Sequence, residues 1–136
     1  MKRYLIDTNH LGEAVNRVSM VRDRIQKMHH DDGIVFGTCG PVLCELLVGV
    51  ILRNDSPETR RRLDGLLQLV RIWPVDLATA DKYAKAYHEL RKAGRALSQV
   101  DILLAALARQ LDASILTTDN DFHALTNIQA ENWLAN

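Results

Sequence analysis

Short apolar runs alternate with amphipathic stretches along this chain, and the alternation predicts strands separated by helices. Residues 3–6 and 34–37 have the composition of strands, and a polar helical stretch lies between them. Further strands are expected over residues 70–73 and 114–117, and a less apolar edge strand over 128–131. Because strands that alternate with helices form parallel sheets, the pattern predicts an α/β fold with a mostly parallel sheet.

Helices are expected at four places after the second strand. They cover residues 42–52, a stretch that opens at Ser56, residues 77–93 and residues 98–111. Pro41 suits a first helical position, and Gly94 stands where a C-terminal glycine cap belongs. Residues 100–111 are apolar almost all round, which predicts a helix buried at the centre of the domain.

Four carboxylates stand where apolar segments meet loops or helices, and no lysine or arginine adjoins any of them in sequence. They are Asp7, Glu45, Asp101 and Asp119. Ligands of open parallel sheets bind beyond the carboxyl ends of the strands, so Asp7 and Asp119 can face one crevice. Asp101, in the first turn of the buried helix, can reach the same place. Glu45 has uncharged neighbours on its helix, and its burial would require a partner such as a metal ion.

Each acid also has a purely structural explanation. Asp7 can cap a turn, Asp101 can favour a helix N-terminus, and Glu45 can be the one solvent-facing position of its helix. Asp119 can serve turn chemistry. The four together favour a divalent metal site, and carboxylate oxygens suit Mg²⁺ or Mn²⁺. Such a site can activate water at a phosphodiester, which is nuclease chemistry. The rival cluster at residues 29–32 is expected to be a solvated loop.

Four segments in order resemble the PIN-domain ribonucleases, and within them the VapC-type toxins of bacterial toxin-antitoxin pairs. They are residues 4–9 (YLIDTN), 41–46 (PVLCEL), 100–106 (VDILLAA) and 115–122 (ILTTDNDF). The resemblance covers the whole chain. It implies a single three-layer PIN-like domain over residues 1–136, with a central, mostly parallel sheet flanked by helices. One departure is Asp112-Ala113 at the exit of the buried helix, where the family commonly has glycine.

The resemblance also implies the site and its chemistry. The metal-binding and catalytic residues would be Asp7, Glu45, Asp101 and Asp119. Asn9 and Thr117 would be secondary, and Asp121 is an alternative or an aid to Asp119. The implied activity is magnesium-dependent endoribonuclease cleavage, with Mn²⁺ as a possible substitute and transfer RNA as a frequent target. The implied partners are the RNA substrate, a cognate antitoxin protein and a second copy of the chain as a homodimer.

Composition narrows these expectations. Lysine plus arginine and aspartate plus glutamate number 17 each, so net charge alone does not favour nucleic acid. Basic clusters at residues 60–62 and 91–95 are solvated helix faces or phosphate contacts. Cys39 and Cys44 match no zinc or disulfide spacing and are expected to be reduced thiols. No apolar run suggests a membrane span or a secretory signal, so a cytoplasmic location is expected.

Other readings make different demands on the sequence. A receiver-like phosphotransfer domain needs a lysine after the last core strand, where this chain has Thr117-Thr118-Asp119. A haloacid-dehalogenase-type phosphatase needs an aspartate at position 9, which is Asn9 here. A catalytically inactive PIN-like module that binds RNA or protein is the remaining alternative. Only a measurement of activity separates it from the nuclease.

Overall fold

The computed structural model describes residues 1–134. Within them, five strands form one sheet: β1 (Lys2–Ile6), β2 (Ile34–Cys39), β3 (Val70–Trp73), β4 (Ser114–Leu116) and β5 (Gln129–Glu131). Six α-helices connect the strands: α1 (Thr8–Ala14), α2 (Met20–His29), α3 (Gly40–Arg53), α4 (Pro57–Leu67), α5 (Leu77–Lys92) and α6 (Gln99–Leu111). A short 3₁₀ helix, η1 (Asn120–Ala124), precedes the last strand.

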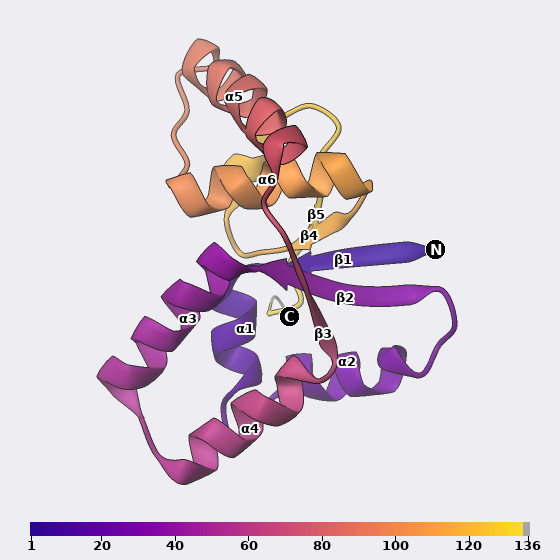
Figure 1. Cartoon of the computed structure of the whole chain (residues 1–136), viewed down its shortest axis with the longest axis vertical. Helices are drawn as coiled ribbons and strands as arrows, with labels where there is room; N and C mark the ends of the chain where they lie inside the picture. The colour runs from indigo at the N-terminus through magenta and orange to yellow at the C-terminus, as the bar shows by residue number, and fades with distance from the viewer. Residues whose placement is uncertain (135–136) are drawn as a thin grey trace.

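The sheet has the strand order β3-β2-β1-β4-β5, and every neighbouring pair is parallel. Helices α5 and α6 lie on one side of it and α1 to α4 on the other, as Figure 1 shows. The predicted three-layer α/β fold with helices around a parallel sheet is therefore confirmed. Because β1 is central and all strands run the same way, the loops after β1, β2 and β4 meet at one end of the sheet.

The hydrophobic core lies between the central strands and the helices. Leu5 and Ile6 of β1 and Ile115 and Leu116 of β4 are fully buried. Helix α6 buries residues 104–108 in succession, so the prediction of a central apolar helix is confirmed. In the part of the chain that the structure describes, no helix is long and apolar enough to cross a membrane.

Local signals explain where most elements begin and end. Pro41 stands in the first turn of α3, Ser56 caps α4, and Ser98 caps α6. Gly94 follows α5 with φ +66°, a left-handed conformation that glycine adopts without steric cost. Gly37 is required for another reason, since a Cβ there would collide with the indole of Trp73.

Two expectations were wrong. The polar stretch between the first two strands forms two helices, α1 and α2, rather than one. Residues 15–19 separate them, and Ser19 caps α2 by accepting a hydrogen bond from the backbone N–H of Arg22. Glu45 is exposed, so it needs no partner to offset burial. It is also not the single solvent-facing position of α3, because Val48 (56% exposed) and Leu52 (77% exposed) share that face.

Candidate metal and nuclease site

Asp7 is the first residue after β1 and is 4% exposed. Its Oδ1 accepts hydrogen bonds from the backbone N–H groups of Asn9 (3.0 Å) and His10 (3.3 Å), so Asp7 is the N-cap of α1. Its own N–H donates to the carbonyl oxygen of Leu116 at the end of β4 (3.0 Å). The turn after the strand therefore fixes both the backbone and the carboxylate of Asp7.

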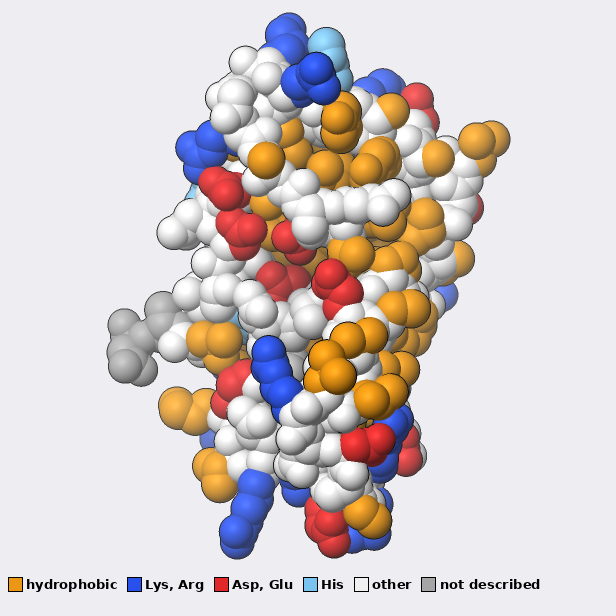
Figure 2. Space-filling model, turned by 90° about the vertical axis from the view of Figure 1, so that its left-hand side faces the viewer, with side chains coloured by type: hydrophobic (Ala, Val, Ile, Leu, Met, Phe, Trp, Pro, Cys, Tyr) orange, Lys and Arg blue, Asp and Glu red, His pale blue; other side chains and the backbone are white. Residues whose placement is uncertain are grey.

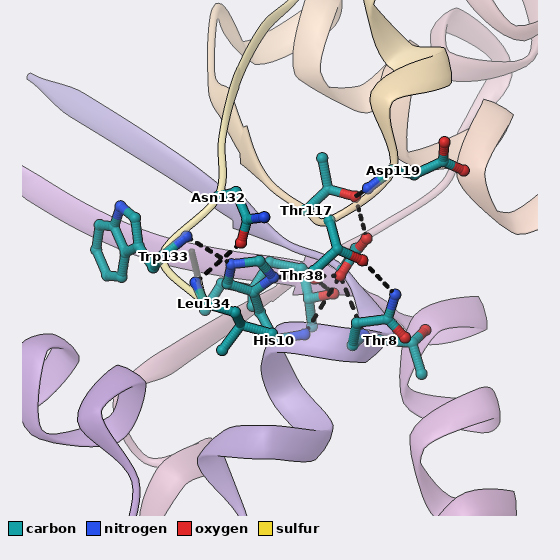
Figure 3. Close-up of polar contacts among 12 residues, drawn as sticks. Thr8, His10, Thr38, Thr117, Asp119, Asn132, Trp133 and Leu134 are labelled. Atoms are coloured by element: carbon teal, nitrogen blue, oxygen red, sulfur yellow. Dashed lines mark hydrogen bonds and ion pairs between the residues drawn. The ribbon is translucent and has the colours of Figure 1, made fainter. Parts of the chain in front are cut away.

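Thr117 and Asp119 follow the strand next to β1. Because Ile6 pairs with Leu116, the residues that come next, Asp7 and Thr117, also lie side by side. The buried hydroxyl of Thr117 donates to Oδ2 of Asp7 and accepts the N–H of Asp119 (3.0 Å). Figure 3 shows the contact between Thr117 and Asp119. One threonine thus ties two acids that are 112 positions apart in the sequence to the same sheet end.

Glu45 reaches the site from the second turn of α3. Its Oε1 accepts a hydrogen bond from the hydroxyl of Thr8 (2.8 Å), which holds the exposed carboxylate beside the start of α1. Asn9 lies on the same side and donates from Nδ2 to the hydroxyl of Thr118 (2.8 Å). Asn9 therefore joins the loop after β4 to α1.

Asp101 lies in the first turn of α6, whose N-cap residue Ser98 accepts the N–H of Asp101 (3.1 Å). The pKa of the Asp101 carboxyl is raised to about 6, chiefly by burial and in addition by the negative charges of Asp7, Asp119 and Glu45, while the hydrogen bond of Ser98 acts in the opposite direction. The charges of the other three carboxylates therefore act on Asp101, which agrees with a position of all four at one crevice.

A cavity of about 610 Å³ brings the four acids together. The other residues that line it are Thr8, Asn9, Cys44, Val48, Gly49, Leu52, Arg53 and Ser98. In Figure 2 acidic side chains surround a hollow in the middle of the face, and hydrophobic side chains run along one side of it. The expectation that the loops and helices bring these acids to one crevice is confirmed. Their roles as ligands stay a prediction.

The donor set suits a hard divalent cation. Among residues 1–134, no lysine or arginine forms an ion pair with any of the four acids, so the carboxylates are not already committed to a basic side chain. In the same span, no three acid, histidine or cysteine side chains stand close enough together to hold an ion as they are. Mg²⁺ commonly binds proteins through only one or two carboxylates and keeps several waters, so it does not require a closed cluster of three protein ligands.

Asp121 lies apart from the acids of the cavity. Its Oδ1 accepts hydrogen bonds from the guanidinium of Arg95, with Nε at 3.1 Å, and it does not line the cavity. Asp119 does line it and also caps η1 through the N–H of Asp121 (2.8 Å). Arg95, from the second basic cluster, is thus committed to an acid. In the first cluster, Arg60 pairs with Asp55 over 2.9 Å.

Sequence reasoning missed Thr8, Cys44, Arg53 and His10 near the site. His10 is fully buried, and its Nδ1 is 3.7 Å from Oδ1 of Asp7. A signal was available for His10, since a position three residues after an N-cap aspartate lies one helical turn above it. Cys39 and Cys44 are free thiols, as predicted, and residues 29–32 are exposed.

Comparison with known proteins gives one consistent result. The model of the PIN domain family matches residues 4–128. Ribonuclease VapC1 of Haemophilus influenzae is 24% identical over 132 residues, which cover 96% of this chain and 97% of that protein. The structure resembles VapBC2 from Rickettsia felis bound to a promoter DNA fragment (TM-score 0.83, 23% identity, 96% and 98% coverage). It also resembles Mycobacterium tuberculosis VapC20, described as a Sarcin-Ricin loop cleaving toxin (TM-score 0.63, 21% identity, 89% and 93% coverage).

Proposed function

The chain belongs to the PIN domain family, and from that premise we propose that it is a metal-dependent endoribonuclease toxin of the VapC type. The observation that carries the proposal is the meeting of Asp7, Glu45, Asp101 and Asp119 around one cavity. Relatives that are named ribonucleases support the reaction class. We propose Mg²⁺ as the cofactor, with Mn²⁺ as a substitute, and the four acids as the residues that hold it.

When bound, the cation would activate a water molecule and neutralise charge at the scissile phosphate. Hydrogen bonds within the chain orient the carboxylates that would hold the cation. Thr117 and the N-terminal N–H groups of α1 orient the Asp7 carboxylate. Ser98 and Thr8 hold the segments that carry Asp101 and Glu45. Arg53 lines the cavity and offers a positive charge to an RNA phosphate.

We propose structured RNA as the substrate. Transfer RNA is the target that we predict, and ribosomal RNA is the alternative, because M. tuberculosis VapC20 is described as cleaving the Sarcin-Ricin loop. The hollow surface beside α3 can accept a bulky substrate, since the acids open directly onto it (Figure 2). The location that we propose is the cytoplasm.

The partners that we propose are a cognate antitoxin and a second copy of the chain. Structural relatives are described as complexes of VapB with VapC, including VapBC2 of R. felis. Helix α3 presents exposed Val48 and Leu52 in the lining of the cavity, and Ile51, next to Leu52 in sequence, is also exposed. Apolar side chains gathered on a surface mark sites of protein association. A protein that covers this part of α3 would also cover the acids.

The test is cleavage of total bacterial RNA by purified protein that is free of any co-purified inhibitor, once with Mg²⁺ and once with EDTA. Wild type and Asp7→Asn are compared, with Asp32→Asn as a matched control because Asp32 is an exposed loop residue. The proposal is supported if wild type and Asp32→Asn give discrete fragments with Mg²⁺ but not with EDTA, and Asp7→Asn gives none. Sequencing of the fragment ends would then identify the RNA. Absence of cleavage by folded wild type would favour the inactive binding module.

A further inference from the structure

His10 is a buried imidazole between the site and the C-terminal segment of the described chain. It lies on α1 one turn after Asp7 and is 0% exposed. Figure 3 shows its ring among Thr38, Trp133 and Leu134, on the side of the site away from Asp119. A histidine in this place has one ring nitrogen toward Trp133 and the other toward Asp7.

The contact with Trp133 determines which ring nitrogen carries the proton. The backbone N–H of Trp133 donates to Nε2 of His10 over 3.0 Å, so Nε2 is an unprotonated acceptor. The neutral ring then carries its proton on Nδ1. Nδ1 is 3.7 Å from Oδ1 of Asp7 and has no hydrogen-bond partner among residues 1–134. The buried N–H of His10 therefore lies just beyond hydrogen-bond range of a carboxylate oxygen of Asp7.

Trp133 is held firmly enough to impose this choice. Its indole packs edge-on against Tyr4 (ring centroids 5.3 Å apart) and Phe36 (5.9 Å). The guanidinium of Arg24 lies 3.9 Å from the centre of the ring. Because β1, β2 and α2 each supply one of these contacts, the position of the Trp133 backbone is set by the body of the domain.

We propose that His10 is a positioning residue for Asp7, through which the anchored segment at Trp133 holds that carboxylate for the cation. The inference rests on the proposed function, because it takes Asp7 as a ligand. Oδ1 of Asp7 accepts two backbone N–H groups, and Oδ2 accepts the hydroxyl of Thr117. Nδ1–H of His10 faces this carboxylate at 3.7 Å from Oδ1, so a small shift of either side chain makes it a further hydrogen-bond donor to Asp7.

Three substitutions separate the two contacts of the ring. In His10→Gln the side-chain oxygen can take the place of Nε2 and accept the N–H of Trp133, but the donor toward Asp7 is lost. In His10→Asn the amide nitrogen stands near the place of Nδ1 and can donate to Asp7, but the acceptor for Trp133 is lost. His10→Leu removes both contacts at similar volume.

The experiment measures Mn²⁺ affinity by calorimetry and melting temperature in EDTA for wild type and the three variants. We expect His10→Gln and His10→Leu to weaken Mn²⁺ binding by about 10-fold or more, a loss typical of removing a group that orients a ligand. His10→Asn should weaken Mn²⁺ binding by much less than 10-fold, because its amide can still donate to Asp7. It should melt at a lower temperature than His10→Gln, because it leaves the Trp133 N–H unpaired. Affinity and stability would then rank the variants differently.

Each outcome decides a separate point. Unchanged Mn²⁺ affinity in folded His10→Gln, or affinities that simply follow the melting temperatures, would overturn the positioning role and leave the proposed function standing. Absence of Mn²⁺ binding by the wild-type protein would overturn both the positioning role of His10 and the proposed metal-dependent function. Long-range ¹H–¹⁵N spectra of wild type, assigned by comparison with His10→Gln, test the tautomer without any metal, and a proton on Nε2 would overturn the inference.

Discussion

The hydroxyl of Thr117 donates a hydrogen bond to the carboxylate of Asp7 and at the same time accepts the N–H of Asp119. Thr117 and Asp7 are both almost fully buried, so water cannot readily replace either contact. The threonine follows β4 and the aspartate follows β1, and the pairing of these strands sets their approach. The geometry of two proposed ligands thus depends on a single side-chain oxygen.

Thr117→Val removes that oxygen and keeps the shape of the side chain. We expect RNA cleavage to fall by about 10- to 100-fold, because Asp7 loses the donor that orients it. The free energy of unfolding should also fall, by about 1–3 kcal/mol, since a buried acceptor and an N–H lose their partner. Thr117→Ser restores the hydroxyl and should recover most of the activity. Cleavage by Thr117→Val at the wild-type rate would show that this contact does not orient the site.

The pair Asp119 and Asp121 offers a matched comparison. Asp119 lines the cavity, whereas Asp121 binds Arg95. Asp119→Asn should therefore abolish or strongly reduce cleavage, while Asp121→Asn should retain most of it with the same substitution two residues away. Cleavage assays on the same RNA, with circular dichroism to establish folding, make the comparison. Loss of activity in Asp121→Asn but not in Asp119→Asn would show that Asp121, and not Asp119, is the fourth acid of the site.

This pair also marks what the sequence could and could not predict. Strand ends and helix caps were predictable, because Asp7, Ser56 and Ser98 act on backbone groups only two or three residues away. The different surroundings of Asp119 and Asp121 were not predictable, since Asp121 binds Arg95 from a different part of the chain. Contacts between segments far apart in the sequence decide such surroundings, and local sequence patterns do not contain them.

His10 and Glu45 are two further residues whose surroundings could not be predicted from the local sequence. His10 lies just outside the first motif, and its partner Trp133 is 123 positions away, so its contact with that residue was not predictable from the sequence. Glu45 was expected to need a partner in order to be buried, because its neighbours on the helix are uncharged. The exposed apolar side chains beside it, such as Val48, explain the error, since α3 is apolar on its open face as well as on its core face.

The ion pair between Glu89 of α5 and Arg109 of α6 should stabilise the fold in a pH-dependent manner. Hydrogen bonds from Arg109, at 2.6 and 2.9 Å, are the largest cause that lowers the pKa of Glu89 to about 2. The folded protein holds this carboxylate ionised more strongly than the unfolded chain does. The stabilisation is therefore complete above the unfolded pKa of about 4.3 and is lost as the pH falls toward 2.

The variant Glu89→Gln tests the predicted direction of this pH dependence. At pH 7 the variant should be less stable by about 1–2 kcal/mol, a value reduced for the partial exposure of the pair. The difference from wild type should shrink between pH 4.5 and pH 2, as followed by urea unfolding at each pH. RNA cleavage at neutral pH should be unaffected, because Glu89 does not line the cavity. A difference that grew on acidification would contradict the assignment.

Asp101 should have the opposite effect on stability when no metal is present. Burial and the charges of the other three acids raise its pKa to about 6, so ionisation is less favourable in the folded protein than in the unfolded chain. The fold therefore has its full stability with respect to this group below pH 4 and loses part of it as the pH rises through 6. In EDTA, Asp101→Asn should be more stable than wild type at pH 8, by roughly 2 kcal/mol, and no more stable at pH 4.

Added Mg²⁺ should reverse that ranking at pH 8. A cation that neutralises the carboxylates binds the folded state only, so it should raise the melting temperature of wild type and have much less effect on Asp101→Asn. Thermal unfolding of both proteins in EDTA and across a range of Mg²⁺ concentrations measures the effect. Equal melting temperatures of wild type with and without Mg²⁺, even at millimolar ion, would show that the four acids do not serve as a magnesium site.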